Sequence, residues 1–399
     1  MIEGWKYETM KDICEVNQGF QINISKREKH KRNNNKIYIT IQHLNNIGDE
    51  EYIKDEDHND YVVCKKEDVL MTRTGNTGRV VTNVEGVFHN NFFKINFDRS
   101  KIDKDFLVYY LNMKSIQTLI LKKAGTSTIP DLNHKDFYSI PFVYPQNIEE
   151  QKALVSVLSN MDRLIDSLQK TIEKKEKIRL KTTNELLENN LKRENFSGKL
   201  RKIKLSEIGY TYSGLNGMRS SNFDGGDKRY ITFLNVLNNP IVKEKLFEKF
   251  HCDNTQERVK KGDLFFNTSS ETPEEVAMCS TINYDVNEVY LNSFCFGFRI
   301  TDNTVNNIYL SYYFRSTYGR NIMKTIAQGS TRFNLPKDKF LNYEIEIPED
   351  INEQKAIVEV LLNIDNEIEL LNKKMQKYKQ IKECLMEELL TGKVRIKYE

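Results

Sequence analysis

Apolar residues recur at a regular spacing in two long stretches of the chain, Ile148–Leu187 and Ile351–Leu390. Their steps alternate between four and three residues, the heptad spacing typical of a helix that buries one narrow seam. The predicted seam positions are Leu154, Leu158, Met161, Ile165, Leu168 and Ile172 in the first stretch and Ile357, Leu361, Ile364, Ile368, Leu371 and Met375 in the second. The pattern predicts two long helices, each of which needs a partner for its seam.

The two stretches are copies of one another. At a constant offset of 203 residues, 18 of the 40 aligned positions are identical. Both copies begin with a predicted capping box, Asn147 with Glu150 and Asp350 with Glu353. Such a repeat predicts that the helices pack on each other as an antiparallel coiled coil with pseudo-two-fold symmetry. The alternative is that each helix packs only on its own domain.

Short runs of β-branched and aromatic residues, broken by Asn and Gly, precede each helix and indicate strands and turns. The expected elements in the first region are strands at Ile37–Ile41, Asp68–Met71, Phe92–Ile95 and Tyr138–Tyr144 and one helix at roughly Asp105–Lys123. The same order returns with weaker identity before the second helix. The predicted fold class is therefore α+β, with two tandem mixed α/β domains separated by the two long helices.

The predicted organisation is domain, helix, domain, helix. Its boundaries are a first domain at 1–146, a central helix at 147–197, a second domain at 198–349, a C-terminal helix at 350–392 and a tail at 393–399. The tail has the same sequence form as the segment Gly198–Ile203 that opens the second domain. We therefore expect the tail to return to the first domain.

Charge and cysteine content limit the class of protein only broadly. The 60 basic residues are nearly balanced by 57 acidic ones, so the net charge of +3 says little by itself. The six cysteines form no Cys-x-x-Cys pair, which argues against a disulfide framework or a zinc ribbon. No apolar run is long enough for a membrane span, and no signal-peptide pattern opens the chain. A cytoplasmic location is expected.

Catalytic signatures are missing from the sequence. We find no phosphate-binding Gly-x-x-x-x-Gly-Lys loop, no glycine-rich cofactor turn and no paired histidines at metal-ligand spacing. Asn238–Ile241 lacks the second proline and the aromatic residue of the motif that adenine methyltransferases use. We therefore expect a non-catalytic chain with no metal and no cofactor of its own.

Several polar loops suit contacts with nucleic acid, although each is also compatible with an ordinary solvated loop or turn. Lys26–Lys36 is strongly basic and suits phosphates, while Arg73–Arg79 offers side chains that read bases or grip phosphates. Small polar segments also follow a helix in both domains. The candidate DNA-binding residues are Lys26, Arg27, Lys29, Lys31, Arg32, Arg73, Thr74, Asn76, Thr77, Arg79, Lys122, Lys123, Thr126, Ser127, Asn267, Ser269, Ser270, Ser330, Thr331 and Arg332.

This layout resembles the specificity subunits of type I restriction–modification enzymes over essentially the whole chain. The segments that carry the resemblance are Glu150–Ala153, Glu353–Ala356, Asp68–Gly78, Gly125–Thr128 and Gly329–Arg332. The second domain departs from the Gly-x-x-Gly pattern of the first at Asn267–Thr272, so individual contacts there are less readily transferred.

The resemblance implies a function in defence against phage. Each globular block would be a target recognition domain that reads one half of an asymmetric, bipartite site in double-stranded DNA, and the helices would set the gap between the halves. The implied partners are two modification (methyltransferase) subunits and restriction (translocase and nuclease) subunits. S-adenosylmethionine, ATP and Mg²⁺ would be bound only by those partners.

Three other interpretations each account for part of the sequence. A free-standing nuclease or methyltransferase would need a metal or cofactor constellation that the sequence does not display. A purely structural coiled-coil scaffold would explain the seam but not two duplicated domains with basic and polar loops. The recognition module of another methylation-based defence system remains open, because sequence alone hardly separates it from a type I subunit.

Overall fold

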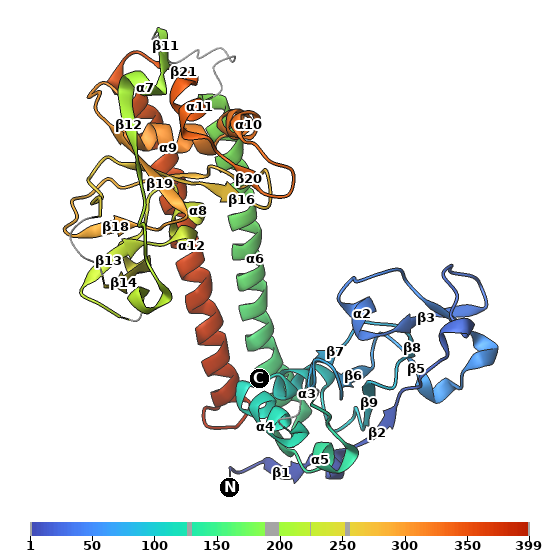
Figure 1. Cartoon of the computed structure of the whole chain (residues 1–399). Helices are drawn as coiled ribbons and strands as arrows, with labels where there is room; N and C mark the ends of the chain where they lie inside the picture. Colours follow the sequence, from blue (N-terminus) through green and yellow to red (C-terminus); the bar gives the residue numbers. More distant parts are fainter. Residues whose placement is uncertain (1, 126–129, 188–198, 224, 252–255, 398–399) are drawn as a thin grey trace. The chain divides into compact units, whose positions relative to one another are not determined.

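The computed structural model describes residues 2–125, 130–187, 199–223, 225–251 and 256–397. The chain divides into two compact units, formed by Met1–Gln169 with Lys373–Glu399 and by Lys170–Asn372. Each unit combines one globular domain with a stretch of each long helix, α6 (Ile148–Leu187) and α12 (Ile351–Leu389) (Figure 1).

In its described residues the first domain has three sheets, with strand orders β2-β9-β6-β7, β4-β3-β8-β5 and β1-β10. Its strands are β1 (Trp5–Thr9), β2 (Cys14–Gln18), β3 (Asn35–Ile39), β4 (Tyr52–Lys54), β5 (Val63–Cys64), β6 (Val69–Thr72), β7 (Val80–Val81), β8 (Gly86–Phe88), β9 (Phe92–Phe97) and β10 (Pro141–Pro145). Its helices are α1 (Met10–Ile13), α2 (Ile41–Leu44), α3 (Lys104–Leu111), α4 (Lys114–Ala124) and α5 (His134–Tyr138).

The second domain repeats this plan, with strand orders β12-β19-β15-β17, β14-β13-β18, β11-β21 and β16-β20. Its strands are β11 (Leu200–Lys204), β12 (Gly209–Ser213), β13 (Lys228–Ile231), β14 (Phe247–Phe250), β15 (Leu264–Asn267), β16 (Ser269–Ser270), β17 (Cys279–Thr281), β18 (Val289–Leu291), β19 (Cys295–Ile300), β20 (Phe333–Asn334) and β21 (Glu344–Pro348). Its helices are α7 (Leu205–Ile208), α8 (Phe233–Asn238), α9 (Asn307–Arg315), α10 (Thr317–Ile326) and α11 (Lys337–Asn342). The predicted α+β fold with an internal repeat is confirmed.

Three sequence predictions overran the elements that the structure contains. The single helix expected at Asp105–Lys123 is two helices, because the chain is extended at Met113 (φ −59°, ψ 140°) between α3 and α4. The strand expected to continue to Ile41 stops at Ile39, where the Thr40 hydroxyl caps helix α2. The strand expected from Tyr138 begins only at Pro141, since Tyr138 is the last residue of α5.

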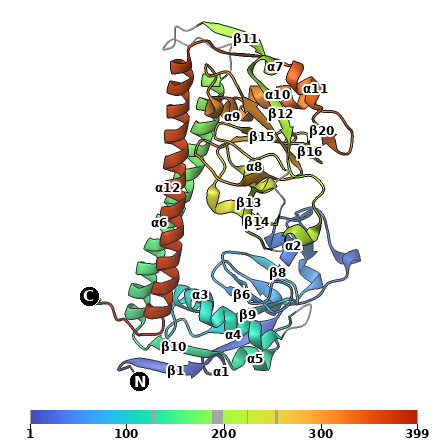
Figure 2. The same ribbon diagram turned by 60° about the vertical axis from the view of Figure 1, so that its left-hand side comes forward.

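The two long helices run in opposite directions within each unit (Figure 1 and Figure 2). In the second unit Lys175 pairs with Glu367 at 2.5 Å and Arg179 pairs with Asp365 at 3.2 Å, so partner numbers fall along α12 as they rise along α6. All twelve predicted seam residues are buried or half-buried. The expected antiparallel pairing is therefore confirmed in each unit.

Each domain core closes over the start of one long helix and the end of the other. In the first unit Leu154 and Leu158 of α6 share a core with Leu390, which follows α12. In the second unit Ile357 of α12 shares a core with Leu187 of α6. The alternative that each helix packs only on its own domain is wrong, because both helices contribute to both cores.

A Tyr–Asp–cation cluster fastens the first domain to the helices. Tyr109 of α3 donates a hydrogen bond from Oη to Asp162 Oδ2 (2.6 Å), and Lys382 of α12 forms an ion pair with the other carboxylate oxygen (2.5 Å). Burial and then this hydrogen bond raise the pKa of Tyr109, so its hydroxyl remains the donor. One carboxylate thus connects three helices.

The second domain repeats the cluster with residues that lie at an offset of 203 in the sequence. Tyr312 of α9 donates to Asp365 Oδ2 at 2.5 Å, and Arg179 of α6 pairs with Asp365 Oδ1 at 3.2 Å. The cation comes from the long helix that does not carry the aspartate, as in the first unit. The identity of Asp162 and Asp365 in the repeat therefore reflects a shared domain-to-helix joint.

A buried glutamine completes each joint. Gln151 accepts a hydrogen bond from the backbone N–H of Asp103 (2.7 Å) and donates one to the carbonyl of Pro145 (2.8 Å). Gln354 makes the equivalent bonds in the second unit, accepting from the N–H of Asn306 at 2.8 Å. Both side chains are fully buried, so each provides hydrogen-bond partners for backbone groups that water cannot reach.

The start of α6 and the tail meet in the first unit. Asn147 caps α6 by accepting the N–H of Glu149 at 2.9 Å, as the sequence predicted for the capping side chain. The Glu150 carboxylate, expected to reach back to the cap, accepts from Trp5 Nε1 (3.2 Å) and pairs with Arg395 of the tail (3.1 Å). The described tail residues, up to 397, form no strand.

Candidate nucleic-acid interface

One end of the second sheet of the first domain gathers polar side chains from two loops. Strands β3 and β8 are parallel, with Ile39 opposite Phe88, so the residues after both strands emerge at the same end. The loops are joined there, because His89 donates its N–H to the carbonyl of Ile39 at 3.0 Å. The turn after β8 is held by His89 Nδ1, which accepts the N–H of Asn91 at 3.1 Å.

A cleft of about 520 Å³ opens at this sheet end, lined by Arg27, Lys29, Tyr38, Thr40, Gln42, His43, Ile47, Gly48, Asp49, Glu51, His89 and Asn91. Burial and then the nearby Arg27 guanidinium lower the pKa of His89, so the imidazole is neutral at pH 7. Gln42 is exposed and Asn91 half-buried at this cleft. The cleft therefore offers cations, carboxamides and a neutral imidazole within one concave surface.

Two of the predicted basic residues are engaged by carboxylates. Arg27 pairs with Glu51 at 2.9 Å, and its side chain is only 17% exposed. Lys26 pairs with Asp57 at 2.7 Å but remains 60% exposed. Arg27 therefore stabilises the wall of the cleft, while the charge of Lys26 is partly neutralised within the domain.

Within the described chain, the remaining basic residues of this segment include one that is paired with a carboxylate and two that are not. Arg32 pairs with Glu28 at 3.4 Å. In the part of the chain that the structure describes, Lys29 and Lys31 form no ion pair, and both are exposed. Lys29 lines the 520 Å³ cleft and Lys31 lines a separate cavity, so these two lysines are the segment's best candidates for phosphate contacts.

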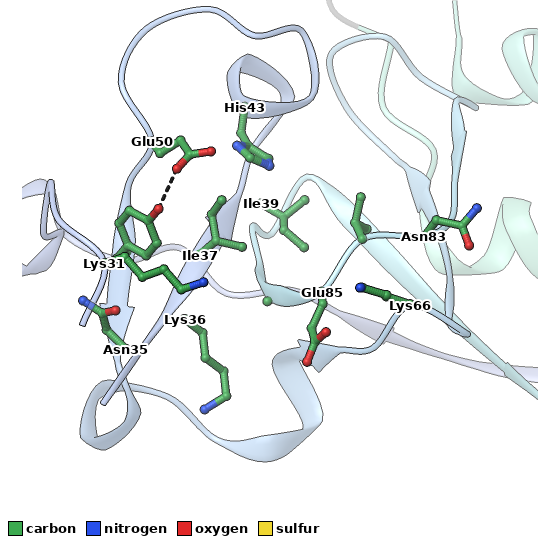
Figure 3. Close-up of a pocket in the computed structure, with 13 residues that line it drawn as sticks. Lys31, Asn35, Lys36, Ile37, Ile39, His43, Glu50, Lys66, Asn83 and Glu85 are labelled. Atoms are coloured by element: carbon green, nitrogen blue, oxygen red, sulfur yellow. Dashed lines mark hydrogen bonds between the residues drawn. The ribbon is translucent and has the colours of Figure 1, made fainter. Parts of the chain in front are cut away.

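That separate cavity measures about 590 Å³ (Figure 3). The amines of Lys31 and Lys66 point toward one another from opposite walls, with Glu85 beside Lys66. Its lining is Lys31, Asn35, Lys36, Ile37, Ile39, His43, Glu50, Tyr52, Lys66, Asn83, Val84, Glu85 and Gly86. His43 also lines the 520 Å³ cleft, so the two hollows adjoin.

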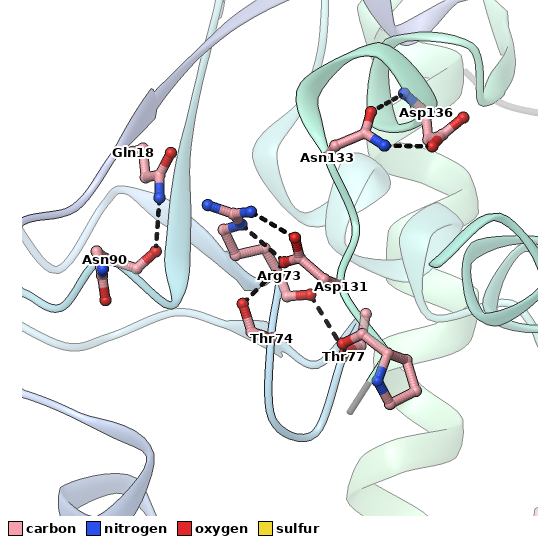
Figure 4. A network of polar contacts seen from close by, with 9 residues as sticks. Gln18, Arg73, Thr74, Thr77, Asn90, Asp131, Asn133 and Asp136 are labelled. Carbon is pink, nitrogen blue, oxygen red and sulfur yellow. Dashed lines mark hydrogen bonds and ion pairs between the residues drawn. The ribbon is translucent and has the colours of Figure 1, made fainter. Parts of the chain in front are cut away.

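The loop after β6 is clamped by an aspartate (Figure 4). Arg73 donates from Nε and Nη2 to the two carboxylate oxygens of Asp131, at 3.1 and 2.7 Å, and Thr74 donates to the same residue at 2.9 Å. Thr77 donates to the carbonyl of Pro130 at 2.7 Å. These three side chains are thus occupied in holding the loop, and their predicted contact with DNA stays a prediction.

The tip of this loop is shaped by left-handed backbone at Gly75 (φ 64°), Asn76 (φ 66°) and Gly78 (φ 88°). Asn76 is exposed at the tip. Arg79 donates to Asn45 Oδ1 at 2.7 Å, which ties the end of the loop to the segment after α2. Among the predicted residues of this loop, Asn76 is the one that is exposed and whose side chain has no hydrogen bond within the described part of the chain.

The helix end at α4 places one more lysine in solvent. Lys122 is exposed, while Lys123 donates to Ser139 Oγ at 2.7 Å. Thr126 and Ser127 lie outside the described residues. The prediction for these two residues therefore remains on the sequence alone.

In the second domain the predicted residues are divided between the interior and the surface. Asn267 is fully buried; its amide donates to the carbonyl of Glu275 at 2.9 Å, and its oxygen accepts the N–H of Met278 at 2.5 Å. Ser269 is also buried and accepts from Arg332 Nε at 3.1 Å. Asn267 therefore stabilises the loop from inside, and contact with DNA does not fit its position.

The remaining second-domain residues are more accessible. Ser270 is half-buried and lies 3.3 Å from the Thr272 hydroxyl. Ser330 and Thr331 are exposed after α10. These positions are compatible with contacts to the DNA backbone.

The strand-end loops of the two domains share one equivalent backbone hydrogen bond. Arg73 donates its N–H to the carbonyl of Asn91 at 2.7 Å, and Thr268 donates its N–H to the carbonyl of Phe294 at 2.9 Å.

Sequence reasoning missed Gln42 and Asn91, which line the 520 Å³ cleft in the first domain. The missing signal was the parallel pairing of β3 and β8, which local patterns do not reveal.

Two kinds of feature are absent from the residues that the structure describes. No helix there is both long and apolar enough to cross a membrane. No group of three or more His, Cys, Asp or Glu side chains in the same residues could hold a metal ion.

Comparison with known sequences gives a consistent result. A family model described as "Type I restriction modification DNA specificity domain" matches residues 2–178 and 197–381. The type I restriction enzyme MjaVIII specificity subunit of Methanocaldococcus jannaschii is 25% identical over 353 residues, covering 85% of this chain and 82% of that protein. A putative type I restriction enzyme specificity subunit, MjaX, from the same organism is 24% identical over 428 residues and covers 99% of this chain and 95% of its own length.

Solved structures share the fold over the whole length. The S subunit of a type I restriction–modification system from M. genitalium superposes with a TM-score of 0.53 at 15% identity, covering 99% of this chain and 97% of that one. A chain from a study of complex assembly and conformational transition in a type I restriction–modification system gives a TM-score of 0.61 at 13% identity, with 99% coverage of both chains. At these identities the likeness concerns the fold alone.

Proposed function

The chain belongs to the family of type I restriction modification DNA specificity domains, and from this premise we propose that each of its two domains reads one half of a bipartite DNA sequence. DNA specificity is the role of the family. The two-part, asymmetric target is the finer claim, and it follows from having two domains with one architecture and different side chains. The chain is a recognition subunit that assembles with other restriction–modification subunits and DNA.

One observation carries this proposal. The same strand-end position recurs in both domains, where the N–H of Arg73 or Thr268 bonds to the carbonyl of Asn91 or Phe294. The backbone is thus repeated while the side chains presented on it differ. A repeated frame with unlike side chains is suited to reading two unlike half-sites.

The helices supply the second part of the function. We assign to α6 and α12 the number of base pairs between the half-sites and the docking of two modification subunits, with restriction subunits completing the assembly. The duplicated joints at Asp162 and Asp365 support this, because they give both domains the same attachment to the helix pair. Adenine-N6 methyl transfer, and the binding of S-adenosylmethionine, ATP and Mg²⁺, belong in this proposal to the partners.

Domain exchange tests the proposal. Residues 1–146 are replaced by the first domain of another family member, and the chimera is expressed with the methyltransferase partner. We expect base-resolution mapping of N6-methyladenine to show new letters in one half-site and the old letters in the other. New letters in both halves would contradict the assignment of one domain to one half-site.

A further inference from the structure

In the first domain the residues that follow β3 and β8 place two carboxamides, Gln42 and Asn91, at the 520 Å³ cleft. Ile39 and Phe88 are parallel partners, and the next turns are linked through the backbone of His89. Gln42, in the first turn of α2, and Asn91, in the turn after β8, both line the 520 Å³ cleft. For the described chain no hydrogen bond of either side chain is found, so their donors and acceptors are open to a ligand.

The second domain builds the same sheet end from different residues. Ile231 and Leu291 are parallel partners, and Asn292 donates its N–H to the carbonyl of Ile231 at 3.1 Å. Asn292 Oδ1 accepts the N–H of Phe294 at 2.9 Å, just as the imidazole accepts the N–H of residue 91 in the first domain. Leu234 lies in the first turn of α8, the counterpart of α2.

The matched positions thus carry opposite chemistry. Leu234 stands where Gln42 stands, and Phe294 stands where Asn91 stands. Leu234 is 63% exposed and Phe294 is 57% exposed. Single exposed apolar side chains are common on protein surfaces. Here, however, both positions that carry carboxamides in the first domain carry exposed apolar side chains in the second. This agreement points to a ligand with an apolar feature at the second site.

We propose, resting on the function proposed above, that these four side chains contact base edges in the major groove. Gln42 and Asn91 form hydrogen bonds in the first half-site, whereas Leu234 and Phe294 pack against thymine methyl groups in the second. The major groove displays both features: adenine offers a donor and an acceptor to a carboxamide, and thymine offers its C5 methyl to an apolar side chain. The second half-site accordingly contains A·T pairs that are read through their methyl groups.

The first test exchanges the chemistry between the domains. The variant Leu234→Gln/Phe294→Asn is compared with Gln42→Leu/Asn91→Phe, each expressed with the methyltransferase partner and mapped for N6-methyladenine. The first variant is expected to alter only the second half-site and the second variant only the first, so each serves as the matched control for the other. Gln42, Leu234 and Phe294 are exposed and Asn91 is half-buried at the cleft, so none of the four belongs to the buried core of its domain.

The outcomes separate the two proposals. If the wild-type chain directs methylation of one bipartite motif and both variants keep every letter, the inference is overturned while the proposed function stands. Weaker binding of the methyltransferase partner together with unchanged letters would also overturn it, by showing that these side chains face a protein. If the wild-type chain directs no motif, both proposals fail.

A second test needs no change in fold. Thymines in the second half-site of the mapped target are replaced one at a time by deoxyuridine, which removes only the C5 methyl group. Binding by the wild-type complex is expected to weaken about fourfold at a contacted position, the value for one buried methyl-sized group. Leu234→Ala/Phe294→Ala should abolish that difference. Equal affinity of the wild-type complex for every deoxyuridine target would overturn the proposed methyl contact.

Discussion

Replacing Asp162 by alanine removes the acceptor that joins α3 to both long helices in the first unit. Tyr109 then loses the partner of its hydroxyl at 2.6 Å, and Lys382 loses its ion pair. A hydrogen bond to a charged group contributes about 1.5–3 kcal/mol. The Asp162 side chain is 39% exposed, so solvent screens the ion pair and we assign it no more than about 0.5 kcal/mol. The free energy for local opening of α3 should fall by about 2 kcal/mol.

Hydrogen exchange of the full chain measures this directly. A loss of about 2 kcal/mol should speed exchange of the α3 amides by roughly 30-fold, because local opening controls their rate. Asp365→Ala should have the same effect on α9, where Tyr312 donates to Asp365. The matched control is Asp166→Ala, since Asp166 is exposed on α6. Equal acceleration of α3 and α9 by one variant, or acceleration by the control, would refute the assignment of one joint to each domain.

Three further changes address DNA binding and spacing. Lys29→Ala and Lys31→Ala should each weaken binding to all DNA and lower the slope of log affinity against log salt by roughly one. Lys26→Ala should change the slope less, because Lys26 is already paired with Asp57 within the domain. A loss of affinity for only one DNA sequence would contradict the phosphate role. Asp131→Ala should loosen its loop by about 1 kcal/mol and relax only the first half-site, as methylation mapping would reveal; relaxation of the second half-site would argue against it. Four residues inserted after Thr182 should change the mapped spacer but not the letters, and an unchanged spacer would remove the role assigned to the helices.

The long helices and the repeat were predictable because their signals are local. The heptad spacing of residues such as Leu158 and Ile165 is visible in a short window, and the second copy confirms it. The joints were not predictable, since Tyr109 and Asp162 are 53 residues apart and meet only through tertiary packing. In retrospect, the identity of Asp162 and Asp365 at solvent-side positions of the repeat was the available signal.

The candidate interface was predicted less well, for a physical reason. The sequence shows where basic residues cluster but not which carboxylates face them in the fold. Arg27, for example, is paired with Glu51, which is 24 residues away in the sequence. Similarly, a small polar residue after a strand can point inward, as Asn267 does. The positions of Gln42 and Asn91 depend on the parallel pairing of two strands that the sequence does not reveal.

The central claim is that this chain chooses the DNA sequence at which its partners act. The most direct measurement is a base-resolution map of N6-methyladenine in cells that express the methyltransferase partner with and without this chain. The account predicts that methylation at one asymmetric, bipartite motif appears only when the chain is present. Methylation at the same sites in its absence would contradict the account.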